Sequence, residues 1–163
     1  MNITTLVAVA ALLAALAAPA SADIEGAVVG VSDGDTMTVL DDARAQHKVR
    51  LAGIDAPEKA QAFGNKAKQA LSDCAFGHRA HVTGSKLDRY GRLVAKVVSN
   101  GVDCNLRQVE LGLAWHYKAY QREQSAEDRT AYSKAELAAR EHRLGLWHDT
   151  EPEPPWDFRR DRR

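Results

Sequence analysis

The sequence is organised around RLAGIDAPE at residues 50–58, which begins like a strand and ends in a turn that carries carboxylates. Apolar and basic residues alternate over residues 47–54, which predicts a half-buried strand with Arg50 directed away from the core. Strict alternation would place Asp55 on the opposite face from Arg50. If both side chains line one site, the strand must bend or end near Gly53.

Two further motifs, DGDT at residues 33–36 and DRYGR at residues 88–92, flank this stretch. DGDT begins like an EF-hand loop, but Met37 and Arg44 stand where that loop needs ligands, which excludes an EF-hand. Alone, such a turn is usually only a polar hairpin loop. Together the motifs offer carboxylates for a hard cation, a carboxylate for a proton and arginines for a phosphate, the groups that phosphodiester hydrolysis needs.

In this order and spacing the motifs resemble those of the staphylococcal (micrococcal) nuclease family, whose catalytic stretches follow DGDT, R-x4-D-x-P-E and D-[KR]-Y-G-R. The similarity extends from about residue 26 to about residue 147. It implies an α+β fold, a five-stranded barrel of the oligonucleotide/oligosaccharide-binding (OB) type with about three helices. It also implies Ca²⁺-dependent hydrolysis of DNA and RNA that leaves 3′-phosphate ends.

The resemblance assigns the metal site. Asp35 and Asp55 are expected to be direct Ca²⁺ ligands, with the main-chain carbonyl of Ala56 as a third. The family often has Thr at this last position, but Ala still supplies the carbonyl. Asp33 is expected to orient the ligands or bound water.

The resemblance also assigns the catalytic groups. Glu58 is the candidate general base, and whether it takes a proton or only orders water stays open. Its alternative role is that of a solvated glutamate at a helix entry. Arg50 and Arg92 are expected to clamp the phosphate and neutralise its growing charge. The alternative is that these arginines are ordinary members of surface ion pairs.

Substrate contacts are expected outside the catalytic centre. Arg89 and Tyr90 match family positions that touch substrate. Tyr117 and Tyr120 belong to an aromatic group that can stack on bases, a mode that favours single strands. For the two tyrosines, packing against the protein is the alternative.

The other elements follow from local patterns. Asn105 is predicted to cap one short helix, and Ser125 with Asp128 to open a longer one that stops at Gly145. Further strands are predicted over residues 24–31, 36–40, 80–85 and 93–99, and helices over residues 65–74 and 106–112.

The N-terminus carries an uninterrupted apolar run over residues 6–18, too short to span a bilayer but typical of a secretory signal. Cleavage after Ala22 would remove residues 1–22, and cleavage after Ala20 is the alternative. No Lys or Arg precedes the run, so an uncleaved anchor also stays open. We expect an exported protein, periplasmic or secreted, with no stable membrane association after cleavage and a monomeric state.

Export would place Cys74 and Cys104 in an oxidising compartment, which favours a disulfide between them. Two buried free cysteines are the alternative.

The charge is balanced, with 22 Lys plus Arg against 22 Asp plus Glu. Because nucleic-acid affinity normally needs a basic surface, either the basic residues gather on one face or binding is weak and salt-sensitive.

One domain is expected over residues 23–148, followed by a Pro/Arg-rich tail over residues 149–163. The prolines of the tail predict that it forms no helix. The tail is either ordered by docking of Trp156 on the domain or disordered.

The rival function is a non-catalytic OB-fold module that only binds nucleic acid. Against it, the chain keeps the metal carboxylates, the candidate base and both arginines.

Overall fold

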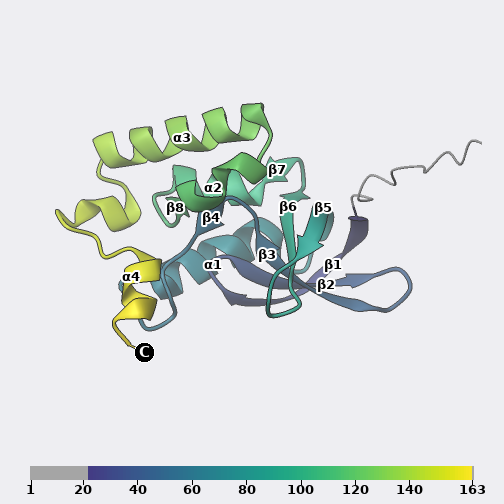
Figure 1. Ribbon diagram of the computed structural model, residues 1–163. Helices are drawn as coiled ribbons and strands as arrows, with labels where there is room; N and C mark the ends of the chain where they lie inside the picture. The colour runs from purple at the N-terminus through teal and green to yellow at the C-terminus, as the bar shows by residue number, and fades with distance from the viewer. Residues whose placement is uncertain (1–21, 163) are drawn as a thin grey trace, which may run out of the picture.

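The computed structural model describes residues 22–162, in which strands close into a barrel and helices pack above it (Figure 1). Neighbouring barrel strands run antiparallel in the order β3-β2-β1-β5-β6, and a parallel pairing of β3 with β6 closes the barrel. The predicted OB-type barrel in an α+β fold is confirmed. Its strands are β1 (Ala22–Asp33), β2 (Thr36–Asp41), β3 (Gln46–Leu51), β5 (Arg79–Leu87) and β6 (Leu93–Ser99).

Strand β1 belongs to both halves of the barrel, because its first half pairs with β5 and its second half with β2. Two register shifts interrupt its pairing with β2, and such bulges increase the bend of a strand. Gly26 lies where the two pairings overlap. A Cβ there would stand 2.5 Å from the Leu40 carbonyl oxygen, so only glycine fits the closure.

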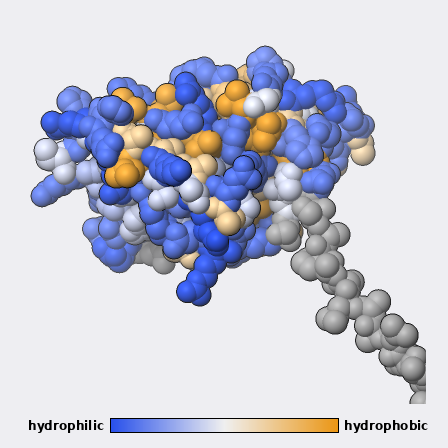
Figure 2. Space-filling model, turned by 90° about the horizontal axis from the view of Figure 1, so that it is seen from above, coloured by the Kyte–Doolittle hydropathy of each residue, from blue (hydrophilic) through white to orange (hydrophobic). Residues whose placement is uncertain are grey.

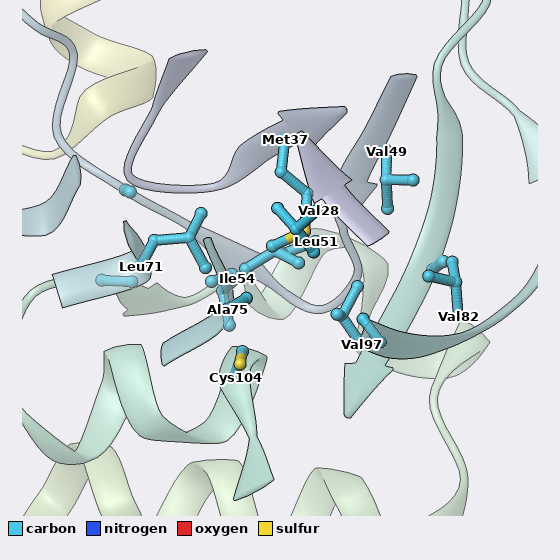
Figure 3. Close-up of a cluster of buried hydrophobic side chains, with 14 of the residues drawn as sticks. Val28, Met37, Val49, Leu51, Ile54, Leu71, Ala75, Val82, Val97 and Cys104 are labelled. Carbon is cyan, nitrogen blue, oxygen red and sulfur yellow. The ribbon is translucent and has the colours of Figure 1, made fainter. Parts of the chain in front are cut away.

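The core fills the barrel and the space between the barrel and the helices. Figure 3 shows the barrel side chains meeting those of the helices around Leu51 and Ile54. The Leu51 and Ile54 side chains are both buried. Along the barrel strands, buried side chains alternate with more exposed ones, as expected for a strand with one face toward the core. The cluster includes Val28, Met37, Val49, Val82 and Val97 from strands, and Leu71, Ala75 and Cys104 from helices.

Three longer helices confirm the predicted number, and shorter elements connect them. Ser125 caps α3, its Oγ accepting from the Asp128 amide at 3.0 Å as predicted. The helix ends at Glu141, before the predicted Gly145, because Arg143 adopts a left-handed φ of 53°. The elements are α1 (Gly64–Ala75), α2 (Cys104–Glu110), α3 (Ala126–Glu141), α4 (Pro155–Arg160), η1 (Lys118–Glu123), η2 (Gly145–His148), β4 (Ile54–Asp55), β7 (Val102–Asp103) and β8 (Trp115–His116).

Two local predictions were wrong. Helix α2 is capped by Asp103, whose carboxylate accepts from the Leu106 amide, and not by Asn105, which lies inside the helix. The tail does form a helix, α4, because Pro154 precedes it and Pro155 occupies its first turn. In the first turn proline removes no hydrogen bond, so the prolines that exclude a helix interior are compatible with a helix start.

The surface over the helices, seen from above in Figure 2, is mainly hydrophilic, with apolar residues in small groups. Among residues 22–162 no helix combines the length and the apolarity that a membrane crossing requires. The predicted signal peptide lies outside the described residues, except for Ala22 at its end.

Asn105 joins α2 to the closing strands. Its Oδ1 accepts from the Val97 amide, and its Nδ2 donates to the Ala52 and Ala95 carbonyls, each at 3.0 Å. The side chain is fully buried, so all of its hydrogen-bonding capacity is used inside the protein.

Replacing Asn105 by Ala should lower the free energy of unfolding by about 3 kcal/mol, because the Val97 amide would stay buried without an acceptor. Urea denaturation followed by circular dichroism would measure it. Gln69→Ala, at an exposed position of α1, is the matched control and should change stability by less than about 0.5 kcal/mol. Equal stabilities of the two variants would contradict the assigned role of Asn105.

The predicted disulfide is present. Cys74 at the end of α1 and Cys104 at the start of α2 are bonded, with Cα atoms 6.0 Å apart and a sequence separation of 30. The bond fixes the two helices against the barrel at the point where both contact the core.

Reduction should therefore lower the melting temperature, because opening a loop of this length costs about 3 kcal/mol in the chain-entropy estimate. Calorimetry with and without reductant measures the effect. The double variant Cys74→Ala/Cys104→Ala should melt at the same temperature in both conditions. An equal melting temperature of the unmodified protein in both would count against a stabilising disulfide.

Candidate active site

A cleft of about 530 Å³ opens at one end of the barrel, between the β5–β6 hairpin, the β3–β4 connection and α4. Every residue that the sequence predicted for catalysis, metal binding or substrate contact lines this cleft. They are Asp33, Asp35, Arg50, Asp55, Ala56, Glu58, Arg89, Tyr90, Arg92, Tyr117 and Tyr120.

The β3 strand ends at Leu51, and this brings Arg50 and Asp55 to one side. Gly53 takes a φ of +73°, after which β4 pairs with β8 instead of continuing the barrel. The Arg50 Nη1 donates to the Leu51 and Ile54 carbonyls, both at 2.9 Å, and so spans the bend. The expected break near Gly53 is confirmed.

The two predicted metal carboxylates lie against the same guanidinium nitrogen. Arg50 Nη2 is 2.8 Å from Asp55 Oδ1 and 3.2 Å from Asp35 Oδ2. The Asp55 side chain has 0% exposure, and burial raises the pKa of Asp55, an effect that Arg159 and Arg50 oppose. Asp35 is also buried, and its Oδ2 accepts from the Ala56 amide at 2.8 Å.

This donor set fits a hard divalent cation such as Ca²⁺. Two carboxylates from separate loops converge beside the Ala56 main chain, and oxygen ligands are those that Ca²⁺ prefers. Among residues 22–162 there is no group of three or more His, Cys, Asp or Glu side chains arranged to hold a metal.

Asp33 supports the turn that carries Asp35. Its Oδ1 accepts from the Asp35 amide at 3.1 Å, which fixes the turn. Burial, followed by the negative charge of Asp35, raises the pKa of Asp33 to about 6. Gln108 of α2 supports the same turn from inside the protein, donating to the Gly34 carbonyl and, at 2.8 Å, to the Ala67 carbonyl.

Arg92 is linked to the Asp35 carboxylate through the hydroxyl group of Thr36. Its Nη1 donates to Thr36 Oγ1, which in turn donates to Asp35 Oδ1, both at 3.1 Å. Asp88, from the same hairpin, holds the Arg92 Nε at 2.7 Å. Burial opposes the ionisation of Asp88, but its hydrogen bonds with Arg92 and Tyr90 lower the pKa of Asp88.

Glu58 and the tyrosines form the outer part of the cleft. Glu58 Oε1 accepts from Arg159 Nη1 at 2.7 Å. Tyr90 is 66% exposed and carries the Arg89 and Arg92 guanidinium groups over its ring, at 4.8 Å and 5.4 Å from the centroid. An exposed aromatic ring such as that of Tyr90 is suited to stacking on bases.

The other pair of tyrosines is partly covered by protein. Tyr117 stacks on Trp156, with ring centroids 5.3 Å apart and planes 14° apart, and the tilted ring of Tyr120 has its centroid 5.2 Å from that of Tyr117. Tyr120 is half exposed and also carries Lys86 over its ring. Of the two roles left open, Tyr117 therefore packs against the tail, whereas Tyr120 keeps an accessible ring.

Several residues that line the cleft or support it from inside the protein were not predicted from the sequence. Arg159 is one of several arginines in the Pro/Arg-rich tail, and its ion pairs with Asp55 and Glu58 depend on the fold of the tail. Lys86 and Glu123 pair with each other across the cleft mouth at 2.5 Å. Gln108 had no sequence signal, because a buried glutamine in a helix resembles any other polar helix position.

Comparisons with known proteins show which family the sequence matches. Residues 48–149 match the family described as staphylococcal nuclease homologue. The chain is 39% identical to the micrococcal nuclease of Shigella flexneri over 160 residues, covering 93% of this chain and 89% of that protein. It is 41% identical over 133 residues to a Haemophilus influenzae protein named as an uncharacterized endonuclease, covering 82% and 71%.

A third relative is Protein ParB of Escherichia coli, 40% identical over 163 residues, with coverage of 93% of this chain and 89% of that protein. The family match includes Arg50 on β3, the carboxylates Asp55 and Glu58, and the hairpin that carries Arg92. On its sequence, its barrel and the arrangement of its cleft, the chain belongs to the staphylococcal nuclease family.

Proposed function

We propose that the protein is a Ca²⁺-dependent nuclease that hydrolyses phosphodiester bonds in DNA and RNA and leaves 3′-phosphate ends. The observation that carries the proposal is Arg50, whose Nη2 contacts both Asp35 and Asp55 while Arg92 and Glu58 line the same cleft. Nuclease activity is supported by the family and by the names of the relatives.

In this proposal Asp35, Asp55 and the Ala56 carbonyl hold the cation. When bound, Ca²⁺ would supply positive charge to a phosphate oxygen and favour ionisation of nearby water. Glu58 accepts a proton from the attacking water. Arg50 and Arg92 donate to the phosphate oxygens and balance the charge that grows on them, and the 5′ oxygen leaves.

The proposed substrate is a single strand or a frayed duplex. Tyr90 and Tyr120 expose ring faces at the cleft, and stacking needs bases that are free of their partners. We further propose that the protein acts as an exported monomer, in the periplasm or outside the cell, after removal of residues 1–22 and without stable membrane association.

The rival function is a non-catalytic barrel that binds nucleic acid. The retained carboxylates argue against it, because burying Asp35 and Asp55 beside each other is costly and serves no purpose in a binding surface for a polyanion. A plasmid-degradation assay separates the two, since a binding module would shift the plasmid in a gel without cutting it.

Hydrolysis should require Ca²⁺ and be poorly supported by Mg²⁺. The smaller Mg²⁺ demands near-ideal octahedral geometry, which a site built from two carboxylates and a carbonyl does not readily give. The test is plasmid degradation in Ca²⁺, in Mg²⁺, and in Mg²⁺ with excess EGTA. Full activity in the last condition would contradict the assignment of Ca²⁺.

Arg92→Lys should lower kcat about a hundredfold while the melting temperature stays within a few degrees, because lysine keeps the charge but loses the planar pair of donors. Arg50→Lys should lose as much activity and also stability, because Arg50 Nη1 holds two backbone carbonyls at the strand bend. Steady-state kinetics and calorimetry measure both.

Arg107→Lys is the matched control, because Arg107 is exposed on α2 and pairs only with Glu110 among residues 22–162. It should leave both kcat and melting temperature unchanged. Near-normal turnover of Arg92→Lys or of Arg50→Lys would reassign that arginine to an ordinary ion pair.

A further inference from the structure

The C-terminal helix α4 is docked over the edge of the cleft. Pro155 and Phe158 are buried, and Trp156 stacks on Tyr117 and meets Trp115 edge to face at 5.5 Å. Gln61 adds a hydrogen bond from its Nε2 to the Glu153 carbonyl at 2.6 Å. These contacts fix the helix so that its last turn faces the carboxylates.

Arg159, on that last turn, forms ion pairs with both Asp55 and Glu58. Its Nη2 lies 2.7 Å from Asp55 Oδ2, and its Nη1 lies 2.7 Å from Glu58 Oε1. The Nη1 also donates to Asp55 Oδ1 at 3.3 Å. We propose that Arg159 is a built-in counter-cation that occupies the metal carboxylate and the candidate base, and that Ca²⁺ must displace it.

Competition follows from which oxygens are still available. Asp55 Oδ1 already accepts from Arg50, and the remaining oxygen, Oδ2, is the one that Arg159 holds. A cation ligated by Asp55 therefore has to share or take an oxygen that Arg159 uses. Both carry positive charge, so binding side by side at one carboxylate is opposed by repulsion.

The guanidinium cannot leave by losing its proton. Burial acts in the opposite direction, but the hydrogen bonds with Asp55 and Glu58 raise the pKa of Arg159 above its already high value. Arg159 is nevertheless 39% exposed and belongs to a short helix near the chain end, so its side chain can turn outward while the apolar contacts of α4 remain. Release is a movement of a side chain and not a titration.

Two consequences distinguish this role from simple docking of the tail. In the metal-free protein Arg159 stabilises the fold, because it neutralises a fully buried carboxylate and its neighbour Glu58. The same contact lowers the affinity for Ca²⁺, because only the fraction of molecules with the contact open can bind. Removing an arginine with a purely structural role would lower the stability of the protein without raising its affinity for the metal.

The inference rests on the proposed Ca²⁺ site, and its test is Ca²⁺ binding measured by isothermal titration calorimetry without substrate. Arg159→Gln should bind Ca²⁺ about tenfold more tightly than the unmodified protein, as expected if about one molecule in ten is open at rest. In EGTA the same variant should melt a few degrees lower. Arg160→Gln, next along the helix but paired with Asp157 and Asp161, should match the unmodified protein in both measurements.

The outcomes are distinct. Equal or weaker Ca²⁺ affinity of Arg159→Gln would overturn the counter-cation role while leaving the metal site standing. The absence of Ca²⁺ binding in every variant would overturn both. Should Arg159→Gln fail to fold, Arg159→Lys provides the same comparison, because its single ammonium cannot hold both carboxylates as the fork does, and it should bind Ca²⁺ more tightly than the unmodified protein.

Discussion

The contact of one guanidinium with two buried carboxylates is the constraint on which the site depends. Asp55 is fully buried and Asp35 nearly so, and without compensation neither would stay charged beside the other. Arg50 Nη2 lies against both, and its Nη1 holds the carbonyls on either side of the strand break. The bend at Gly53, the end of β3 and the position of the two buried carboxylates are therefore one structural feature.

That constraint also explains how a protein of zero net charge can bind a polyanion. The cleft is lined by five basic and six acidic side chains, so its own residues do not give it an excess of positive charge. A bound divalent cation would make the cleft positive only at the point where the phosphate must lie. Affinity is then tied to the cation rather than to a broad basic surface, which keeps unproductive binding weak.

The period-two patterns predicted the individual strands, whereas the barrel and the catalytic residues of the cleft were predicted by the family resemblance that three short motifs carry. The sequence did not predict the capping residue of α2, because Asp103 and Asn105 are both good caps and only the packed barrel shows that Asn105 is needed at Val97. The prediction that the tail forms no helix was wrong for a related reason. Proline breaks a helix in its interior, but its position at the helix start makes it compatible with α4.

The position of α4 could not be read from composition, since four arginines near a chain end look like a solvated charge cluster. What selects Arg159 among them is its register on a helix whose Trp156 and Phe158 already face the domain. The residue that follows Phe158 then points to the cleft, and Asp55, the most buried carboxylate there, is the partner that gains most from a counter-charge. Packing of apolar rings thus sets an electrostatic contact that local sequence rules do not encode.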